Sequence, residues 1–209
     1  MYTIKEIFYT LQGEGARAGR PAVFCRFAGC NLWNGLESGR SEAVCKFCDT
    51  DFIGTNGSLG GKYKIAEDLA VLIDSQWPQG YGYKYVVLTG GEPLLQVDSN
   101  LIDELHRFGF EVAVETNGTI EAPEGIDWIC VSPKSNAKVL QLSGNELKLV
   151  YPQLDASPKI FENMTFDYFY LQPMDGLDQM NNIQLTIEYC RNNPKWRLSL
   201  QTHKTIGIR

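Results

Sequence analysis

The sequence has no excess of basic residues. Its 209 residues include 19 lysines and arginines against 25 aspartates and glutamates, which gives a formal net charge of -6 at pH 7. This balance leaves no basic surplus to neutralise the phosphates of a nucleic acid, so a nucleic-acid partner is not expected. A small molecule is the more natural substrate.

Long apolar runs are also missing. Residues 1–10 have neither the basic stretch nor the apolar run of a secretory signal, and no stretch of about eighteen apolar residues occurs. We therefore expect no membrane partner and a cytoplasmic location. Repeats and low-complexity tracts are absent, and 44% apolar residues suffice for one sizeable core. We expect a single domain spanning residues 1–209.

Short β-rich segments alternate with helical patterns along the chain. Strands are predicted at residues 4–10, 22–28, 85–88, 111–116, 128–131, 146–150, 168–172 and 197–201, and helices at 65–77, 101–108 and 183–190. This alternation predicts an α/β fold with mainly parallel strands and few helices, a partial (β/α) barrel with its active site at the C-terminal strand ends. Three predicted helices are too few for a complete eight-fold barrel.

Three of the six cysteines lie in a long segment without periodicity, about residues 28–64. Loops of that length in compact domains are usually functional, and a short helical insert is compatible with its sequence. Cys30, Cys45 and Cys48 have the spacing C-x14-C-x2-C. In a reducing compartment, clustered cysteines bind metal or do redox chemistry more often than they form disulfides.

The spacing of these cysteines is compatible with two kinds of metal site. Three thiolates on one loop can hold three irons of a 4Fe-4S cubane and leave the fourth iron free for another ligand. Alternatively, Cys25 and Cys30 could join Cys45 and Cys48 in a structural zinc site with four sulfurs. For Cys25, Cys130 and Cys190 we expect a core role, because their surroundings are apolar. Spacing alone favours the cluster and the zinc ion about equally.

Several short motifs add context to the cysteines. They are Leu11-Gln12-Gly13-Glu14-Gly15, Arg26, Cys48-Asp49-Thr50, Thr89-Gly90-Gly91-Glu92-Pro93, Glu115-Thr116-Asn117-Gly118, Ser132-Pro133-Lys134 and Gln172-Pro173-Met174-Asp175. In this order, and over nearly the whole chain, they resemble the 7-carboxy-7-deazaguanine synthase family of radical S-adenosylmethionine (SAM) enzymes. The gap between the first two cysteines is longer than in most radical SAM enzymes, and a subgroup of this family shares it.

The resemblance implies a partial barrel of the radical SAM type and a carbon–nitrogen lyase activity. The reaction would convert 6-carboxy-5,6,7,8-tetrahydropterin to 7-carboxy-7-deazaguanine with loss of ammonia, in the queuosine-type deazapurine biosynthesis that serves tRNA modification. Implied cofactors are a 4Fe-4S cluster on Cys30, Cys45 and Cys48, SAM at its open iron, and Mg²⁺ on Thr50. The resemblance also implies that no side chain acts as catalytic acid or base, since a radical derived from SAM would remove the substrate hydrogen.

The same resemblance implies contacts and partners. SAM is expected to contact Phe47, Cys48, Asp49, Gly91, Ser132, Pro133, Lys134, Gln172, Pro173, Met174 and Asp175. The pterin is expected to contact Leu11, Gln12, Gly13, Glu14, Arg26, Thr89, His203 and Arg209. A guanidinium such as that of Arg26 can bind a carboxylate through two hydrogen bonds. A flavodoxin-like or ferredoxin-like electron donor and a homodimer are also implied.

Two other functions stay open at this point. One is a radical SAM activase acting on a protein partner, which would have little use for Arg26 and Thr50 as substrate contacts. The other is a zinc-stabilised binding module without catalysis.

Overall fold

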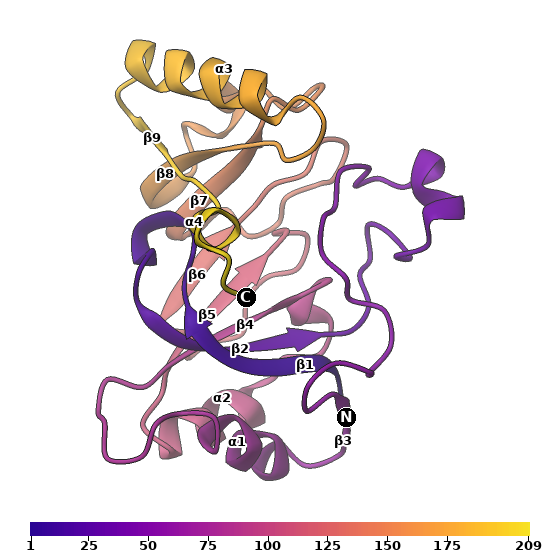
Figure 1. The fold of residues 1–209 in the computed structure, drawn as a ribbon, viewed down its shortest axis with the longest axis vertical. Helices are drawn as coiled ribbons and strands as arrows, with labels where there is room; N and C mark the ends of the chain where they lie inside the picture. The colour runs from indigo at the N-terminus through magenta and orange to yellow at the C-terminus, as the bar shows by residue number, and fades with distance from the viewer.

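The computed structural model describes residues 1–209 and contains one nine-stranded sheet (Figure 1). The strands are β1 (Tyr2–Leu11), β2 (Pro21–Phe27), β3 (Gly61–Tyr63), β4 (Tyr85–Gly90), β5 (Glu111–Thr116), β6 (Trp128–Val131), β7 (Ser143–Tyr151), β8 (Thr165–Pro173) and β9 (Trp196–Leu198). Their order in the sheet is β3-β1-β2-β4-β5-β6-β7-β8-β9. Strand β1 pairs antiparallel with β2 and β3, and all other pairs are parallel. The predicted mainly parallel α/β sheet is confirmed.

Four α-helices accompany the sheet. They are α1 (Ala66–Asp74), α2 (Ser99–Arg107), α3 (Gln179–Asn192) and α4 (Thr202–Ile206), and short 3₁₀ helices occur at Gly15–Arg17, Glu37–Glu42, Pro93–Leu95 and Pro158–Phe161. Helices α1 and α2 pack together at one end of the sheet, and α3 covers the other end beside β8 and β9 (Figure 1). None of these helices combines the length and the apolar character needed to cross a lipid bilayer.

Helix α1 is shorter than the predicted 65–77. Leu69 and Ile73 are fully buried, as the apolar spacing predicts, but Ile65 is the extended residue before the helix and is mostly exposed. Trp77 lies beyond the last turn and is buried. The apolar pattern therefore identified the buried face correctly, while the ends of the helix are set by contacts outside it.

The end of the chain differs more from the prediction. The strand predicted at residues 197–201 is only three residues long, since β9 ends at Leu198, and α4 follows where no helix was predicted. The backbone N–H and the hydroxyl of Thr202 both donate to the carbonyl oxygen of Gly13, at 3.0 and 2.7 Å. These bonds draw the chain out of the sheet. A helix of one turn carries too little periodicity to be predicted.

Strand β2 shows how the sheet separates core from cavity. Val23, Cys25 and Phe27 are fully buried in the larger hydrophobic core, on the side covered by α1 and α2. Phe24 and Arg26 alternate with them and line a cavity on the other face. Cys25 therefore has the predicted core role and points away from the cavity.

The other two cysteines with an expected core role differ from Cys25. Cys190 is half-buried and packs against the smaller core, which contains Phe169 and Trp196. Cys130 is buried as predicted, yet it also lines the cavity, with its sulfur 3.6 Å from a carboxylate oxygen of Glu146. The apolar neighbours of Cys130 in the sequence do not reveal this polar contact, because Glu146 lies on the adjacent strand.

The connection between β1 and β2 closes one side of the barrel. Figure 1 shows it curling toward β7, β8 and α4. The backbone N–H of Gly15 donates to Ser199 Oγ, and that of Ala16 to a carboxylate oxygen of Glu146, both at 2.9 Å. Gly15 has a φ of +63°, and a Cβ there would lie 1.9 Å from Glu146 Oε1, so a glycine is required. This packing brings residues 11–14 to the cavity.

Candidate active site

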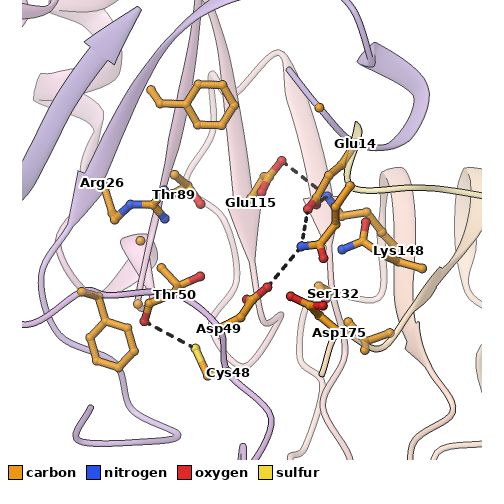
Figure 2. Close-up of a pocket in the computed structure, with 18 of the residues that line it drawn as sticks. Glu14, Arg26, Cys48, Asp49, Thr50, Thr89, Glu115, Ser132, Lys148 and Asp175 are labelled. Atoms are coloured by element: carbon orange, nitrogen blue, oxygen red, sulfur yellow. Dashed lines mark hydrogen bonds and ion pairs between the residues drawn. The ribbon is translucent and has the colours of Figure 1, made fainter. Parts of the chain in front are cut away.

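A cavity of about 470 Å³ lies at the C-terminal ends of the parallel strands, where the barrel prediction put the active site. Its walls come from β1, β2 and β4–β8, the loop of residues 28–64, the β1–β2 connection and α4 (Figure 2). All predicted site residues line it except Pro133. Pro133 is buried behind the wall, and its carbonyl oxygen accepts a hydrogen bond from Gln153 Nε2 at 3.2 Å. The structure thus brings the predicted site residues together.

Cys30, Cys45 and Cys48 lie on one wall of this cavity. The Cys45 thiol donates a hydrogen bond to the Cys48 sulfur, and this bond lowers the pKa of Cys48 to about 6. The same bond, together with burial, raises the pKa of Cys45. The two sulfurs therefore lie close enough to share a proton, and thiolates are the form that ligates metals. This set of sulfur donors fits an iron–sulfur cluster.

The geometry disfavours the four-sulfur zinc site. No group of three or more His, Cys, Asp or Glu side chains in residues 1–209 converges as ligands of a single metal ion. Cysteines of a cubane each bind a different iron and need not converge in that way. Cys25, the fourth sulfur that zinc would need, is buried on the opposite face of β2.

The Thr89–Pro93 turn is pressed against the cysteine loop. A Cβ at Gly91 would lie 2.0 Å from the carbonyl oxygen of Gly29 and 2.9 Å from Cys30 Cβ, so only a glycine fits. The backbone of this turn therefore lies directly beside the first of the three cysteines. A glycine at this position is thus required by packing against the cysteine loop, and Gly91 also lines the cavity.

Glu92, within the same turn, ties two predicted motifs together. Its fully buried carboxylate accepts hydrogen bonds from the hydroxyl of Thr116 and the backbone N–H of Asn117, both at 2.8 Å, and from that of Leu94 at 3.0 Å. Burial raises the pKa of Glu92, and the three hydrogen bonds oppose this shift. Asn117 in turn donates to Asn31 in the cysteine loop at 3.0 Å. Glu92 thus fixes the ends of β4 and β5 relative to that loop.

A buried acid–base cluster forms the wall opposite Arg26 (Figure 2). The ammonium nitrogen of Lys148 lies 2.6 Å from Glu14 Oε2 and 3.5 Å from Glu115 Oε1, and its side chain is only 5% exposed. Gln12 Nε2 also donates to Glu115 Oε1, at 2.9 Å. Burial alone would lower the pKa of Lys148, but the surrounding acidic groups, with Cys130, raise it well above its usual value.

Arg26 enters the cavity from β2, opposite Glu6 of β1. Its Nε donates to Glu6 Oε1 at 3.0 Å, and the other carboxylate oxygen of Glu6 pairs with Arg209. Figure 2 shows the Arg26 guanidinium directed toward Thr89. No protein group accepts a hydrogen bond from its two Nη nitrogens. These nitrogens are therefore available to an anionic group in the cavity.

An aromatic pair lines the cavity beside Arg26. The rings of Phe8 and Phe24 are stacked, with centroids 5.6 Å apart and an interplanar angle of 11°. The Arg209 guanidinium lies 4.4 Å from the centroid of Phe8. Sequence analysis did not single out these two phenylalanines. Their alternation with buried residues in β1 and β2 is the signal that puts them on the cavity face.

The segment that begins at Gln201 supplies polar groups that were not predicted. Gln201 and Lys204 line the cavity with His203. The imidazole of His203 fills the space beside Gly13, where a Cβ would lie 2.2 Å from Nδ1. Lys204 Nζ lies 2.5 Å from Oδ2 of both Asp49 and Asp175. The chain end is therefore part of the cavity wall.

Known proteins similar to this chain share one description. A 7-carboxy-7-deazaguanine synthase of Bradyrhizobium diazoefficiens is 62% identical over 208 residues, which cover 100% of this chain and 99% of that protein. A protein of the same description from Caulobacter vibrioides is 60% identical over 207 residues, 99% of each chain. The chain belongs to the 7-carboxy-7-deazaguanine synthase family. No family model matches the chain.

A solved structure agrees with this membership of the synthase family. The crystal structure of QueE from Escherichia coli is similar, with a TM-score of 0.71 and 31% sequence identity, covering 95% of this chain and 93% of that one. The mainly parallel sheet with few helices is thus the fold of a radical SAM enzyme. Membership of this synthase family supports the lyase reading over the activase and the zinc-binding module.

Proposed function

We propose that this chain converts 6-carboxy-5,6,7,8-tetrahydropterin to 7-carboxy-7-deazaguanine, with loss of ammonia, as a step of deazapurine biosynthesis. The observation that carries the proposal is one cavity in which three cysteines face a wall of charged and polar side chains of both signs. The synthases of Bradyrhizobium and Caulobacter, alike over nearly their full length, support it. When bound, the cluster and SAM supply the removal of a hydrogen atom that no side chain can achieve.

The protein's own residues would hold these groups in fixed positions. Cys30, Cys45 and Cys48 would ligate the cluster. The backbone at Gly91 would approach SAM, since Gly91 lies beside Cys30 in the cavity wall. Further SAM contacts would come from Phe47, Asp49, Ser132, Lys134, Gln172, Pro173, Met174 and Asp175, with Pro133 shaping the wall from behind. Lys134 donates to the carbonyl and hydroxyl oxygens of Ser132, at 2.7 and 2.6 Å, which fixes that part of the wall.

The pterin would lie between Arg26 and the acid–base cluster. The free Nη nitrogens of Arg26 suit its carboxylate, and the stacked Phe8 and Phe24 suit a flat ring. Lys148 and Glu14 offer donors and acceptors to the edge of that ring. Leu11, Gln12, Gly13, Thr89, His203 and Arg209 complete the same side of the cavity.

Arg26→Ala should weaken binding of the carboxylated pterin because a charge-assisted pair is lost. The Arg26 side chain is only 20% exposed, so we expect a loss of about 2 kcal/mol, or about thirtyfold in Kd. Anaerobic calorimetry of the cluster-loaded enzyme measures this. Arg107→Ala, a change at an exposed arginine of α2, is the matched control and should leave Kd unchanged. Equal pterin affinity in Arg26→Ala would remove Arg26 from the site.

A magnesium ion is a further proposal for this site. Thr50 lines the cavity between Asp49 and Asp51, and a hydroxyl oxygen is a hard ligand of the kind Mg²⁺ prefers. Thr50→Ala should therefore blunt the increase of turnover on adding magnesium, whereas Thr50→Ser should keep it. Turnover measured against magnesium concentration tests this. A full magnesium response in Thr50→Ala would contradict the assignment.

We also propose the setting in which the enzyme works. Residues 1–209 would form one radical SAM domain with residues 28–64 as its cluster-binding loop, since the β1–β9 sheet is continuous. The exposed part of that loop would receive electrons from a flavodoxin-like or ferredoxin-like donor. A cytoplasmic homodimer is proposed on family resemblance.

Anaerobic incubation with SAM, a reductant and 6-carboxy-5,6,7,8-tetrahydropterin tests the function directly. Mass spectrometry should reveal a product lighter than the substrate by one ammonia. The same mixture without SAM should leave the pterin intact. Cleavage of SAM with no change in the pterin would refute the proposed substrate and leave the radical chemistry standing.

A further inference from the structure

The segment from Gln201 to Lys204 contacts both halves of the cavity. Figure 1 shows α4 beside the β1–β2 connection, and Thr202 anchors it there through Gly13. Glu14, on that connection, belongs to the proposed pterin half. Asp49 follows the cluster ligand Cys48 and belongs to the proposed SAM half. Side chains at the start of α4 lie between the two.

Gln201 makes the direct link. Its Nε2 donates to Glu14 Oε1 at 3.0 Å and to Asp49 Oδ2 at 3.2 Å. Figure 2 shows Glu14 on the side of Lys148 and Asp49 on the side of Cys48. A single amide thus fixes one carboxylate in each half, so that a shift of either acid is felt by the other.

Lys204 extends the link across the SAM half. Its Nζ lies 2.5 Å from Asp49 Oδ2 and from Asp175 Oδ2, and it donates to Gln201 Oε1 at 2.9 Å. Without this cation the two carboxylates would repel each other at short range. Lys204 therefore positions Asp49, Asp175 and the amide of Gln201 together.

We propose that Gln201 and Lys204 couple the two halves, so that SAM and the pterin each raise the affinity of the enzyme for the other. The inference rests on the proposed function. Gln201 and Lys204 join Glu14, Asp49 and Asp175 in one hydrogen-bonded network, so a ligand that fixes the carboxylate of one half also fixes those of the other half. The second ligand then meets side chains that are already ordered. Such coupling is reciprocal, whichever ligand binds first.

The coupling is measured by anaerobic calorimetry on enzyme with its oxidised cluster and no reductant, so that neither ligand reacts. In the wild-type enzyme, saturating SAM should lower the Kd of the pterin by about fivefold or more. We call the Kd of the pterin without SAM divided by its Kd with SAM the coupling ratio. In Lys204→Met this ratio should fall toward one, because the cation is lost while the length of the side chain is kept. Lys204→Arg should keep most of the ratio. Lys159→Met, at an exposed lysine remote from the cavity, is the matched control and should not change it.

Gln201→Leu tests the same link independently. It remains a valid test of the coupling if Lys204→Met does not retain its cluster. It should also bring the ratio toward one. A wild-type ratio of one, or unchanged ratios in the variants, would overturn the coupling. The coupling would also be overturned if the variants raised the Kd of the pterin by the same factor with and without SAM, because these side chains would then be ordinary pterin contacts. Failure of the proposed function looks different, since the wild-type enzyme would then neither bind nor convert the pterin.

Discussion

Replacing Cys48 with alanine should abolish both the iron–sulfur absorption and the cleavage of SAM. Cys48 is one of three cysteines on the cavity wall, so the change removes one of the three proposed sulfur ligands. An iron without its protein ligand is lost or becomes labile, and an incomplete cluster cannot deliver an electron to SAM. We expect SAM cleavage below detection and a marked drop in bound iron. Anaerobic purification, iron analysis and chromatography of the cleavage products measure these effects.

Two other cysteines serve as controls for this experiment. Cys190→Ala, in α3 against the smaller core, should keep the colour and the SAM cleavage. Cys25→Ala distinguishes the cluster from a zinc site, because only zinc would use this sulfur. Its side chain is fully buried in the larger core, so some loss of stability is expected without loss of iron. Retention of a SAM-cleaving cluster in Cys48→Ala, or loss of iron in Cys25→Ala, would refute the ligand assignment.

The main elements of the fold follow from local sequence patterns. The apolar face of α1 and the strands β4 to β8 depend on residues close together in the chain, and they were found at nearly the predicted places. The predicted residues from β4 to β8 gather in one cavity because C-terminal ends of parallel strands meet at one edge. The ends of elements were less predictable, since contacts from distant segments set them, as Gly13 does for α4.

The polar network of the cavity could not be predicted in the same way. The pair of Lys148 with Glu14 joins residues 134 positions apart, and the bond from Gln12 to Glu115 spans 103. A local signal for Lys148 existed: it alternates with apolar residues in β7, on the same face as Glu146. A buried charge in a strand requires a partner, but the sequence does not identify it.

The interior of the cysteine loop was only partly predictable from the sequence. Its lack of periodicity predicted a loop with a short helical insert, and the structure has a 3₁₀ helix at Glu37–Glu42. The end of the predicted loop is wrong, because Gly61–Tyr63 form the edge strand β3, which is too short to show a period and is held by pairing with β1. The sequence gives no sign that Arg40 stacks on Trp33 and donates to the carbonyl oxygens of Lys46 and Cys48, at 3.0 and 3.1 Å. The long gap between the first two cysteines thus folds back and braces the turn that carries the other two.

Lys148→Met is expected to cause the largest loss of stability among single changes in the cavity wall. It leaves the partly buried carboxylates of Glu14 and Glu115 without their buried cation, and we expect a cost of about 3 kcal/mol, the lower end for a broken buried pair. Urea unfolding of the cluster-free protein measures the difference. The matched control is Lys84→Met, which breaks the more exposed pair with Asp74 and should cost no more than about 1 kcal/mol. A loss as small as that of the control would show that the cluster does not stabilise the fold.

The pH dependence of Lys148→Met separates this explanation from a simple packing defect. In the wild-type protein, burial alone would raise the pKa of Glu14, but Lys148 lowers it below its usual value. Glu14 therefore stabilises the wild-type fold above its unfolded pKa of about 4.3, and this stability is lost as the pH falls through the lower folded pKa. In the variant, burial is opposed only by the hydrogen bond from Gln201 and by the nearby His203. Since burial is the largest influence on Glu14, we expect the folded pKa of Glu14 to rise above the unfolded one. The variant then loses stability as the pH rises from the unfolded pKa of Glu14 to its raised folded pKa.

Between about pH 8 and about pH 5, the free energy of unfolding of Lys148→Met should therefore increase, because protonation relieves the buried charge. The contribution of Glu14 to the wild-type protein should stay constant over the same range, since its folded and unfolded pKa values both lie lower. Lys148 itself, with a pKa raised well above its usual value, stays charged throughout this range. A packing defect predicts the same loss at both pH values. If the free energies of unfolding of variant and wild type differ less at the lower pH, the uncompensated carboxylate of Glu14 is therefore the cause.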